Sequence, residues 1–176
     1  MSELGQRLLD ASFLEGDFVL RSGRRSKFYL DKYLFSTRPD LLRDIAAGLA
    51  EKLPALGPFD LLAGPELGAV AIVAAVSLVC GKPFVIVRKG AKGYGTDKVM
   101  EGKAEPGQRV VIIEDVVTSG GAALMAADAL RAAGLEVDAL LCVVDHEEGG
   151  RAQIEEKGLR FDPLFTATSL GIKKPG

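Results

Sequence analysis

The chain has 176 residues, 48% of them hydrophobic, and a formal net charge of −2. This length and apolar content favour one domain with a substantial core over two domains. The near-neutral charge, with cations gathered in residues 21–27 and 88–103, excludes a broad nucleic-acid surface and favours a local anion site.

The apolar residues and the cysteines argue against a membrane protein and against a secreted protein. The densest apolar stretch, residues 67–80, is shorter than the about 20 residues that a membrane helix needs. We expect no secretory signal, because residues 1–7 lack a basic region followed by an apolar stretch. Cys80 and Cys142 form no Cys-x-x-Cys or zinc-ligand pattern, so we expect reduced core cysteines in a cytoplasmic protein.

The first half of the chain alternates helical and extended patterns. Residues 4–13 predict an amphipathic helix, and residues 18–31 predict two short strands around a Ser-Gly turn. Pro39 suits the first turn of a helix that extends to residue 53. A strand at 60–63 and a helix at 69–79 follow, joined by a turn at 64–68. The backbone N–H groups of that turn could hold pyrophosphate, or it could be a plain strand-to-helix connection.

The second half continues the alternation. We expect strands at 84–87, 110–115, 137–145 and near Phe161, and helices at 122–133 and 150–157. Alternating strands and helices predict a parallel sheet covered on both faces, with ligands bound outside the carboxyl ends of the strands. The turn at 64–68, the loop from residue 88, the turn at 118–121 and His146 should all lie at that edge.

Residues 110–122 carry the most informative pattern. An apolar strand leads into Glu114 and Asp115 and then into the turn Thr118-Ser119-Gly120-Gly121. Backbone N–H groups of this turn, with the positive end of the next helix, can hold one phosphate. The two carboxylates would repel a phosphate unless they accept hydrogen bonds from hydroxyls or balance a cation. A sugar phosphate such as ribose 5-phosphate therefore fits better than a nucleoside triphosphate.

A structural explanation of the same residues stays open. The acids could simply end a core strand, with Thr118 or Ser119 capping the next helix. The chain has neither a Walker loop nor a strand followed by Gly-x-Gly-x-x-Gly.

Residues 88–102 form a basic loop with four cations and four glycines. Such a loop suits a step in which a dianionic leaving group is gripped, shielded from water and released. Taken alone, it could equally be a solvated surface loop.

Three stretches together resemble a known family. Residues 114–122 resemble the motif by which type I phosphoribosyltransferases bind phosphoribosyl pyrophosphate (PRPP). The pattern Arg88-Lys89-x-x-Lys92-x-Tyr94-Gly, ending in Glu-Gly, resembles the catalytic loop of the orotate phosphoribosyltransferases. Residues 18–31 resemble the hood segment that covers the base in those enzymes. The resemblance extends from about Leu14 to the end of the chain.

The resemblance implies the type I phosphoribosyltransferase fold. This is an α/β fold with a central, mostly parallel sheet flanked by helices and a small N-terminal hood. Residues 1–176 would form one domain, with the N-terminal helix and hood in 1–36 and the α/β core in 37–176.

The implied reaction transfers the 5-phosphoribosyl group from PRPP to orotate, giving orotidine 5′-monophosphate and pyrophosphate in de novo pyrimidine synthesis. Mg²⁺ would be carried with PRPP, without protein ligands. By the same resemblance Lys92 and Asp115 are catalytic. The implied PRPP-binding residues are Arg21, Arg88, Lys89, Lys92, Tyr94, Glu114, Asp115, Val116, Val117, Thr118, Ser119, Gly120, Gly121 and Ala122. The implied orotate-binding residues are Tyr29, Leu30, Thr118 and His146.

Two residues depart from the family pattern. Tyr94 stands where the family usually has histidine, so the position keeps a hydrogen-bond donor but loses a group that can be cationic near neutral pH. His146 stands where the family generally has arginine, which would be a permanent bidentate cation. Tyr29 could serve either hairpin packing or the substrate.

The family also implies a homodimer, in which residues 88–102 of one subunit close over the neighbouring site. No nucleic-acid or membrane partner is expected. Two alternatives remain open: a type I phosphoribosyltransferase for another base, which His146 favours, and a non-catalytic PRPP-binding regulator. The intact Arg88-Lys89-x-x-Lys92 set favours catalysis over regulation.

Overall fold

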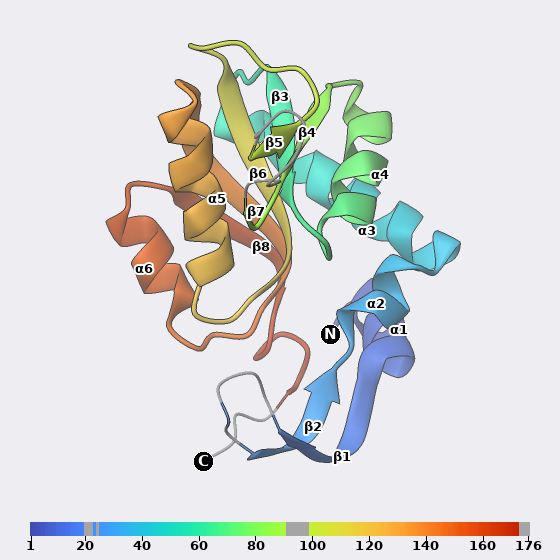
Figure 1. Cartoon of the computed structure of the whole chain (residues 1–176). Coiled ribbons are helices and arrows are strands. Elements are labelled where there is room, and N and C mark those ends of the chain that lie inside the picture. The colour runs from blue at the N-terminus through green and yellow to red at the C-terminus, as the bar shows by residue number, and fades with distance from the viewer. Residues whose placement is uncertain (20–22, 24, 91–98, 173–176) are drawn as a thin grey trace.

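A six-stranded sheet forms the centre of the molecule, with helices on both faces and a hairpin beyond one end (Figure 1). The computed structural model describes residues 1–19, 23, 25–90 and 99–172, with the backbone alone for Ser26. The strand order is β5-β4-β3-β6-β7-β8, and only β5 runs antiparallel to its neighbour. The bounds are β3 Leu61–Pro65, β4 Phe84–Val87, β5 Met100–Glu101, β6 Arg109–Val117, β7 Glu136–Asp145 and β8 Arg160–Thr166. The predicted mostly parallel α/β fold is confirmed.

Two layers of helices cover the sheet because its strands are apolar on both faces. Helices α3 (Pro39–Lys52) and α4 (Val70–Cys80) pack on one face, and α5 (Gly121–Ala132) and α6 (Gly150–Glu156) on the other. Along β6, Val111 and Ile113 join the core beneath α3 and α4, whereas Ile112 joins the core beneath α5 and α6. Burial on both faces explains the continuous apolar runs of the sequence.

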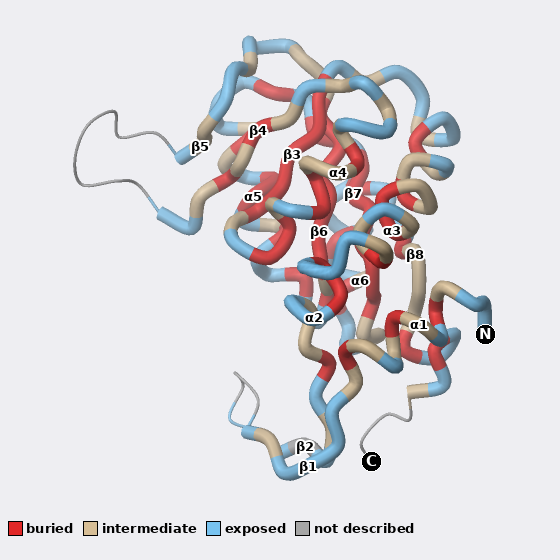
Figure 2. The backbone as a smooth tube through the Cα atoms, turned by 90° about the vertical axis from the view of Figure 1, so that its right-hand side faces the viewer, coloured by how far each residue is buried: buried red, intermediate tan, exposed pale blue. Residues whose placement is uncertain are grey.

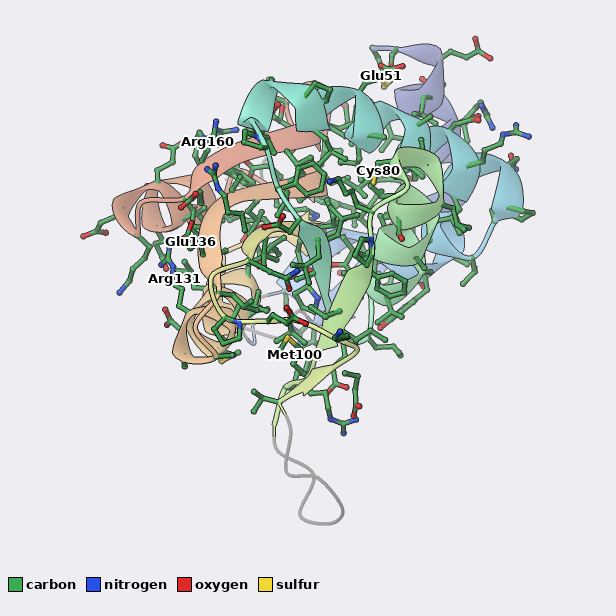
Figure 3. All side chains as sticks on the ribbon, turned by 90° about the horizontal axis from the view of Figure 1, so that it is seen from above. Glu51, Cys80, Met100, Arg131, Glu136 and Arg160 are labelled. Atoms are coloured by element: carbon green, nitrogen blue, oxygen red, sulfur yellow. The ribbon has the colours of Figure 1, made fainter. Side chains whose placement is uncertain are left out.

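The buried residues follow the central strands, whereas the hairpin is largely exposed (Figure 2). Figure 3 views the molecule from the opposite end, where Glu136 and Arg160 mark the first residues of β7 and β8. Charged side chains, those of Glu136 and Arg160 among them, lie at that end.

The N-terminal segment forms a helix and a hairpin. Helix α1 (Glu3–Ser12) is capped by Ser2, whose hydroxyl accepts a hydrogen bond from the Gly5 N–H at 3.1 Å. Strands β1 (Phe13–Val19) and β2 (Arg25–Leu30) pair antiparallel, and the short helix α2 (Lys32–Ser36) follows. The hairpin projects beyond the end of the sheet at which β6 and β7 terminate (Figure 1).

Several element bounds differ from the prediction. β1 begins at Phe13 rather than residue 18, because Phe13 already pairs with Leu30 although residues 14–17 show no strand-like alternation. β6 extends two residues beyond Asp115. The short elements α2, β5 and the 3₁₀ helix η1 (Leu53–Leu56) are too short for a periodicity signal.

Both cysteines are free, and Cys142 is buried as expected, whereas Cys80 is only half-buried. Among the described residues, no helix is both long and apolar enough to cross a membrane.

Candidate functional site

The candidate site lies where the strand order of the sheet reverses, between β3 and β6. The chain runs from β3 to β4 on one side of β3 and later returns to β6 on its other side. The pairing of β3 with β6 is last seen at Ala63 and Ile112, whereas β6 continues to Val117. A crevice at such a switch point, outside the carboxyl ends of the strands, is where open α/β sheets bind ligands.

Glu114 and Asp115 occupy the part of β6 that extends past its pairing with β3. Both are buried, with 5% and 2% of their surface exposed. Each carboxylate folds back onto the next backbone amide: the Asp115 N–H donates to Glu114 Oε1 at 3.0 Å, and the Val116 N–H donates to Asp115 Oδ1 at 2.6 Å. The two acids are therefore fixed in orientation before any ligand binds.

The two acids differ in their electrostatics. Burial and then the neighbouring charge of Asp115 raise the pKa of Glu114 well above its usual range. Asp115 instead has a cationic partner, because Lys32 Nζ lies 2.7 Å from its Oδ2. Asp115 thus has a cation beside it, whereas burial disfavours the charged form of Glu114.

The turn after β6 has the geometry of an anion site. Thr118 and Ser119 are exposed, and Gly120 takes a left-handed conformation (φ 81°) that begins α5 without a side-chain cap. The first N–H groups of a helix have no acceptor within the helix, and at α5 they open onto this exposed turn.

Gly150, the first residue of α6, packs against this turn. Its N–H donates to the Thr118 carbonyl oxygen at 3.0 Å. A Cβ at position 150 would lie 2.5 Å from that oxygen and 2.6 Å from Val117 Cγ1. Only glycine leaves room for the turn in its present position.

Gly150→Ala is therefore expected to displace the turn and to weaken, at least about tenfold, the PRPP binding that the sequence resemblance implies. Overpacking should also cost about 1–3 kcal/mol in unfolding free energy. Calorimetric titration with PRPP and thermal unfolding measure the two effects. The control is Gly48→Ala, which lies away from the turn. Its Cβ would be 2.9 Å from Leu164 Cδ1. It should leave PRPP affinity unchanged, and equal PRPP affinity in both variants would contradict the assignment.

His146 follows the last residue of β7 and lies beside the turn. Its N–H donates to the Val117 carbonyl oxygen at 2.8 Å. The imidazole is largely buried, its Nδ1 lies 3.7 Å from Glu148 Oε1, and its buried Nε2 has no hydrogen-bond partner among the described residues. Burial lowers the pKa of His146, so the ring is neutral at pH 7.

The loop that presents His146 is held in a constrained conformation. Glu147 has a positive φ of 56°, which is uncommon for a residue other than glycine. Its N–H donates to Asp145 Oδ1 at 2.8 Å, and its carboxylate accepts hydrogen bonds from the N–H and hydroxyl of Thr168. Conformations of this kind persist where surrounding contacts fix them, and they concentrate at functional sites.

The basic loop begins and ends next to the turn that follows β3. The Lys89 N–H donates to Glu66 Oε1, and the Arg88 N–H donates to the Val99 carbonyl oxygen, both at 2.8 Å. Arg88 Nη1 lies 3.7 Å from Glu101 Oε1. Glu66 thus ties the base of the basic loop to the turn at 66–69.

The two hairpin residues that the resemblance placed against the base differ in how far they are exposed. Tyr29 is 41% exposed, with its ring 5.6 Å from that of Phe18, whereas Leu30 is 6% exposed and belongs to the core. Only the backbone of Leu30 is left to meet a ligand.

The structure thus brings most of the predicted residues to one edge. Those at the carboxyl ends of β4, β6 and β7, or in the loops that follow, are Arg88, Lys89, Glu114, Asp115, Val116, Val117, Thr118, Ser119, Gly120, Gly121, Ala122 and His146. Arg21, Lys92 and Tyr94 lie outside the described residues.

Sequence reasoning missed Lys32 and Gly150, and it included Glu66 only as part of the turn at 64–68. Lys32 and Glu66 make contacts with residues far away in the sequence, and a helix-starting glycine such as Gly150 carries no local sign of what it packs against.

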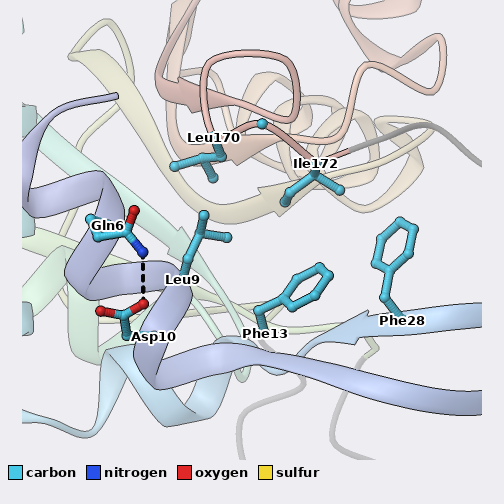
Figure 4. A pocket seen from close by; sticks show the side chains of 8 residues that line it. Gln6, Leu9, Asp10, Phe13, Phe28, Leu170 and Ile172 are labelled. Atoms are coloured by element: carbon cyan, nitrogen blue, oxygen red, sulfur yellow. Dashed lines mark hydrogen bonds between the residues drawn. The ribbon is translucent and has the colours of Figure 1, made fainter.

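A cavity of about 510 Å³ lies elsewhere, between α1, the hairpin and residues 170–172 (Figure 4). Its lining includes Leu9, Phe13, Phe28 and Ile172 and none of the predicted ligand-binding residues. Gln6 and Asp10, two polar side chains of its lining, are hydrogen-bonded to each other at 2.7 Å. We therefore place the functional site at the sheet edge.

Comparisons with known proteins show which proteins the chain is similar to. Residues 37–157 match the family described as a phosphoribosyl transferase domain. The orotate phosphoribosyltransferase of Methanocella arvoryzae is 46% identical over 160 residues, which cover 91% of this chain and 90% of the relative. That of Thermococcus gammatolerans is 44% identical over 180 residues, which cover 99% and 95%.

Solved structures of orotate phosphoribosyltransferases are also similar to the chain. The orotate phosphoribosyltransferase from Aeropyrum pernix is 31% identical, with a TM-score of 0.85 over 95% of both chains. The Mycobacterium tuberculosis orotate phosphoribosyltransferase in complex with PRPP is 30% identical, with a TM-score of 0.81 over 96% of this chain and 97% of that one.

Proposed function

The chain belongs to the orotate phosphoribosyltransferases, and from that premise we propose that it converts orotate and PRPP to orotidine 5′-monophosphate and pyrophosphate in de novo pyrimidine synthesis. The observation that carries the proposal is the pair of buried acids, Glu114 and Asp115, set directly before an open anion turn at the switch point of the sheet. Hydroxyls and a phosphate joined by one sugar fit this arrangement.

The sugar end of PRPP would bind along β6 and its turn. The N–H groups of residues 118–122 would hold the 5-phosphate, with the positive end of α5 directed at it. Asp115 and Glu114 would face the 2- and 3-hydroxyls of the ribose, and Val116 and Val117 would form the backbone between the two groups. A neutral Glu114 can donate as well as accept a hydrogen bond, which suits a hydroxyl.

Displacement at the anomeric carbon develops positive charge on the ribose ring and negative charge on the leaving pyrophosphate. The carboxylate of Asp115 would stabilise the ring, and the cations Arg88, Lys89 and Lys92 would stabilise the pyrophosphate. Arg21 and Tyr94 are assigned to PRPP by their positions in the family motifs. Glu66, which holds the Lys89 backbone, would keep the base of the loop against the turn at 66–69.

Mg²⁺ carried with PRPP would neutralise part of the pyrophosphate charge. Such a metal needs no protein ligand.

The base would lie between the hood and the loop after β7. Thr118, the backbone of Tyr29 and Leu30, and the imidazole of His146 would contact it. The unpartnered Nε2 of His146 supports this, because a buried polar atom without a partner is costly unless a ligand satisfies it.

His146→Ala is expected to raise the Michaelis constant (KM) for orotate about threefold to tenfold and that for PRPP less, because one neutral hydrogen bond is worth roughly 0.5–1.5 kcal/mol. Steady-state kinetics with each substrate varied in turn measures the difference. His146→Gln keeps a donor and an acceptor and should lose less. Since the lowered pKa leaves the ring neutral, orotate KM should not change between pH 7 and pH 8 through His146.

The assignment of His146 would be wrong if an orotate-bound structure showed the ring away from the base and the alanine variant kept normal orotate kinetics. The residue would then be a packing residue of the loop.

We also propose a homodimer in which residues 88–102 of one subunit close over the neighbouring site. An apolar helix face supports a protein partner: α4 is apolar except for Ser77, and Leu78 and Val79 are 88% and 53% exposed on it. Light scattering of the purified protein gives the mass that tests this state.

A phosphoribosyltransferase for another base is the second candidate, and His146 favours it. A neutral imidazole cannot pair with the carboxylate of orotate as arginine does. A non-catalytic PRPP-binding regulator is the third.

Incubation with orotate, PRPP and Mg²⁺, followed by chromatography, tests the proposal. We expect one orotidine 5′-monophosphate for each pyrophosphate, with turnover stopped by a chelator and restored by Mg²⁺. PRPP binding without turnover on any base would support the regulator instead.

A further inference from the structure

Lys32 makes the one ion pair to Asp115 seen among the described residues. It is the first residue of α2, directly after the hood strand β2, and its Nζ lies 2.7 Å from Asp115 Oδ2. The lysine side chain is 34% exposed, whereas Asp115 is 2% exposed. A cation from the N-terminal segment thus reaches the central strand at the point where we place the ribose.

Gly68 packs directly against this pair. A Cβ at position 68 would lie 1.6 Å from Asp115 Oδ2 and 2.9 Å from Lys32 Nζ. The pair therefore lies against the turn after β3.

The backbone around Lys32 is fixed on both sides. The Asp31 carboxylate caps α2 by accepting a hydrogen bond from the Tyr33 N–H at 3.0 Å, and the Asp31 N–H donates to the Ser12 carbonyl oxygen at 2.8 Å. These contacts give Lys32 a defined place between the hood and the sheet.

Few of the charged or titratable groups in the described part of the chain face this pair. Besides Lys32 and the two acids, α2 contributes Tyr33, whose ring centroid is 5.7 Å from Lys32 Nζ. β7 contributes Cys142, a thiol kept neutral because burial raises its pKa, and Asp145, which lies 3.7 Å from Arg151. Burial opposes the charge of Lys32, but the ion pair with Asp115 outweighs it and raises the pKa of the lysine.

We propose that Lys32 is a positioning residue of the ribose site, which keeps Asp115 ionised and oriented to accept a hydrogen bond from a PRPP hydroxyl. The inference rests on the proposed function, because it assigns the ribose to Asp115. Without the cation, two adjacent buried carboxyl groups would compete for one proton, and Asp115 would lose its fixed charge.

Kinetics of Lys32→Met, which keeps the apolar stem and removes the charge, tests the role. We expect kcat/KM for PRPP to fall about tenfold or more at pH 7, and orotate KM to change less than about threefold. Lys32→Arg should recover most of the loss, because it restores a cation. The matched control is Lys52→Met: Lys52 pairs with Asp162 at 2.9 Å and is 27% exposed, but lies outside the site. It should leave both constants unchanged.

The pH profile separates positioning from simple packing. Since a nearby cation favours the ionised carboxyl, its loss moves the acid limb of kcat/KM for PRPP to higher pH, by about one unit or more. The defect of Lys32→Met should thus shrink as the pH rises, whereas a purely structural defect would be the same factor at every pH.

A ligand-free measurement keeps this inference separable from the proposed reaction. Titration of the Glu114 and Asp115 carboxyl carbons by nuclear magnetic resonance should show higher midpoints in Lys32→Met than in the wild type, whether or not orotate is the substrate. Unchanged midpoints, or a pH profile parallel to that of the wild type, would overturn the role of Lys32. Failure of the wild type to use orotate, with shifted midpoints, would overturn the proposed function alone.

Discussion

Asp115→Asn is expected to lower kcat/KM for PRPP about 100-fold to 1000-fold, which corresponds to roughly 3–4 kcal/mol of transition-state stabilisation. The side chain keeps its shape, but the proposed ribose site loses its negative charge. Lys32, 2.7 Å away, is left without its counter-ion and adds a positive charge beside a ring that is itself becoming positive. Steady-state kinetics with PRPP varied at saturating orotate measures the loss.

Glu114→Gln is the matched comparison. Because burial and the charge of Asp115 raise the pKa of Glu114, the neutral amide resembles the form that Glu114 favours in the free protein. Its defect should be smaller than about tenfold. If Glu114→Gln were as damaging as Asp115→Asn, the division of charge between the two acids would be wrong. Retention of more than about a tenth of wild-type kcat/KM by Asp115→Asn would remove its catalytic role.

Lys92→Ala is expected to lower turnover by about 100-fold or more, because one cation on a developing negative charge contributes about 3 kcal/mol or more to lowering the barrier. Lys92 lies outside the described residues, so this prediction rests on the match of the basic loop to the family pattern. Stopped-flow or steady-state assays measure the turnover, and thermal unfolding checks that the fold is intact. A variant that keeps more than about a third of wild-type turnover would exclude Lys92 from this role.

Hybrid dimers test whether the loop acts across the subunit interface. Equal amounts of Lys92→Ala and Asp115→Asn subunits, mixed under conditions of proven exchange, should recover up to about a quarter of the wild-type sites. Half of the reassociated dimers would be hybrids, and each would combine one intact loop with one intact acid. No recovery would mean that each subunit closes its own site.

The part of the site that could be predicted from the sequence is the part built from consecutive residues. β6, the two acids, the turn and α5 follow one another along the chain, so strand periodicity and helix-start chemistry were sufficient to place them. Parallel strands then bring their carboxyl ends to one edge, which placed His146 beside the turn.

The contacts that position those residues could not be predicted in the same way. Lys32 reaches Asp115, Glu66 holds the Lys89 backbone, and Gly150 supports Thr118 only because tertiary packing brings distant segments together. The start of β1 was missed for a related reason, since hairpin pairing extended a strand through residues with little strand pattern.

The most direct test of the central claim is the ratio of kcat/KM values for orotate, uracil, adenine and hypoxanthine, each measured with PRPP and Mg²⁺. We predict that orotate is preferred by at least about 1000-fold, because a site that satisfies buried polar groups with one base leaves them unpaired with another. Equal or better use of another base, or no PRPP consumption with any of the four, would contradict the account.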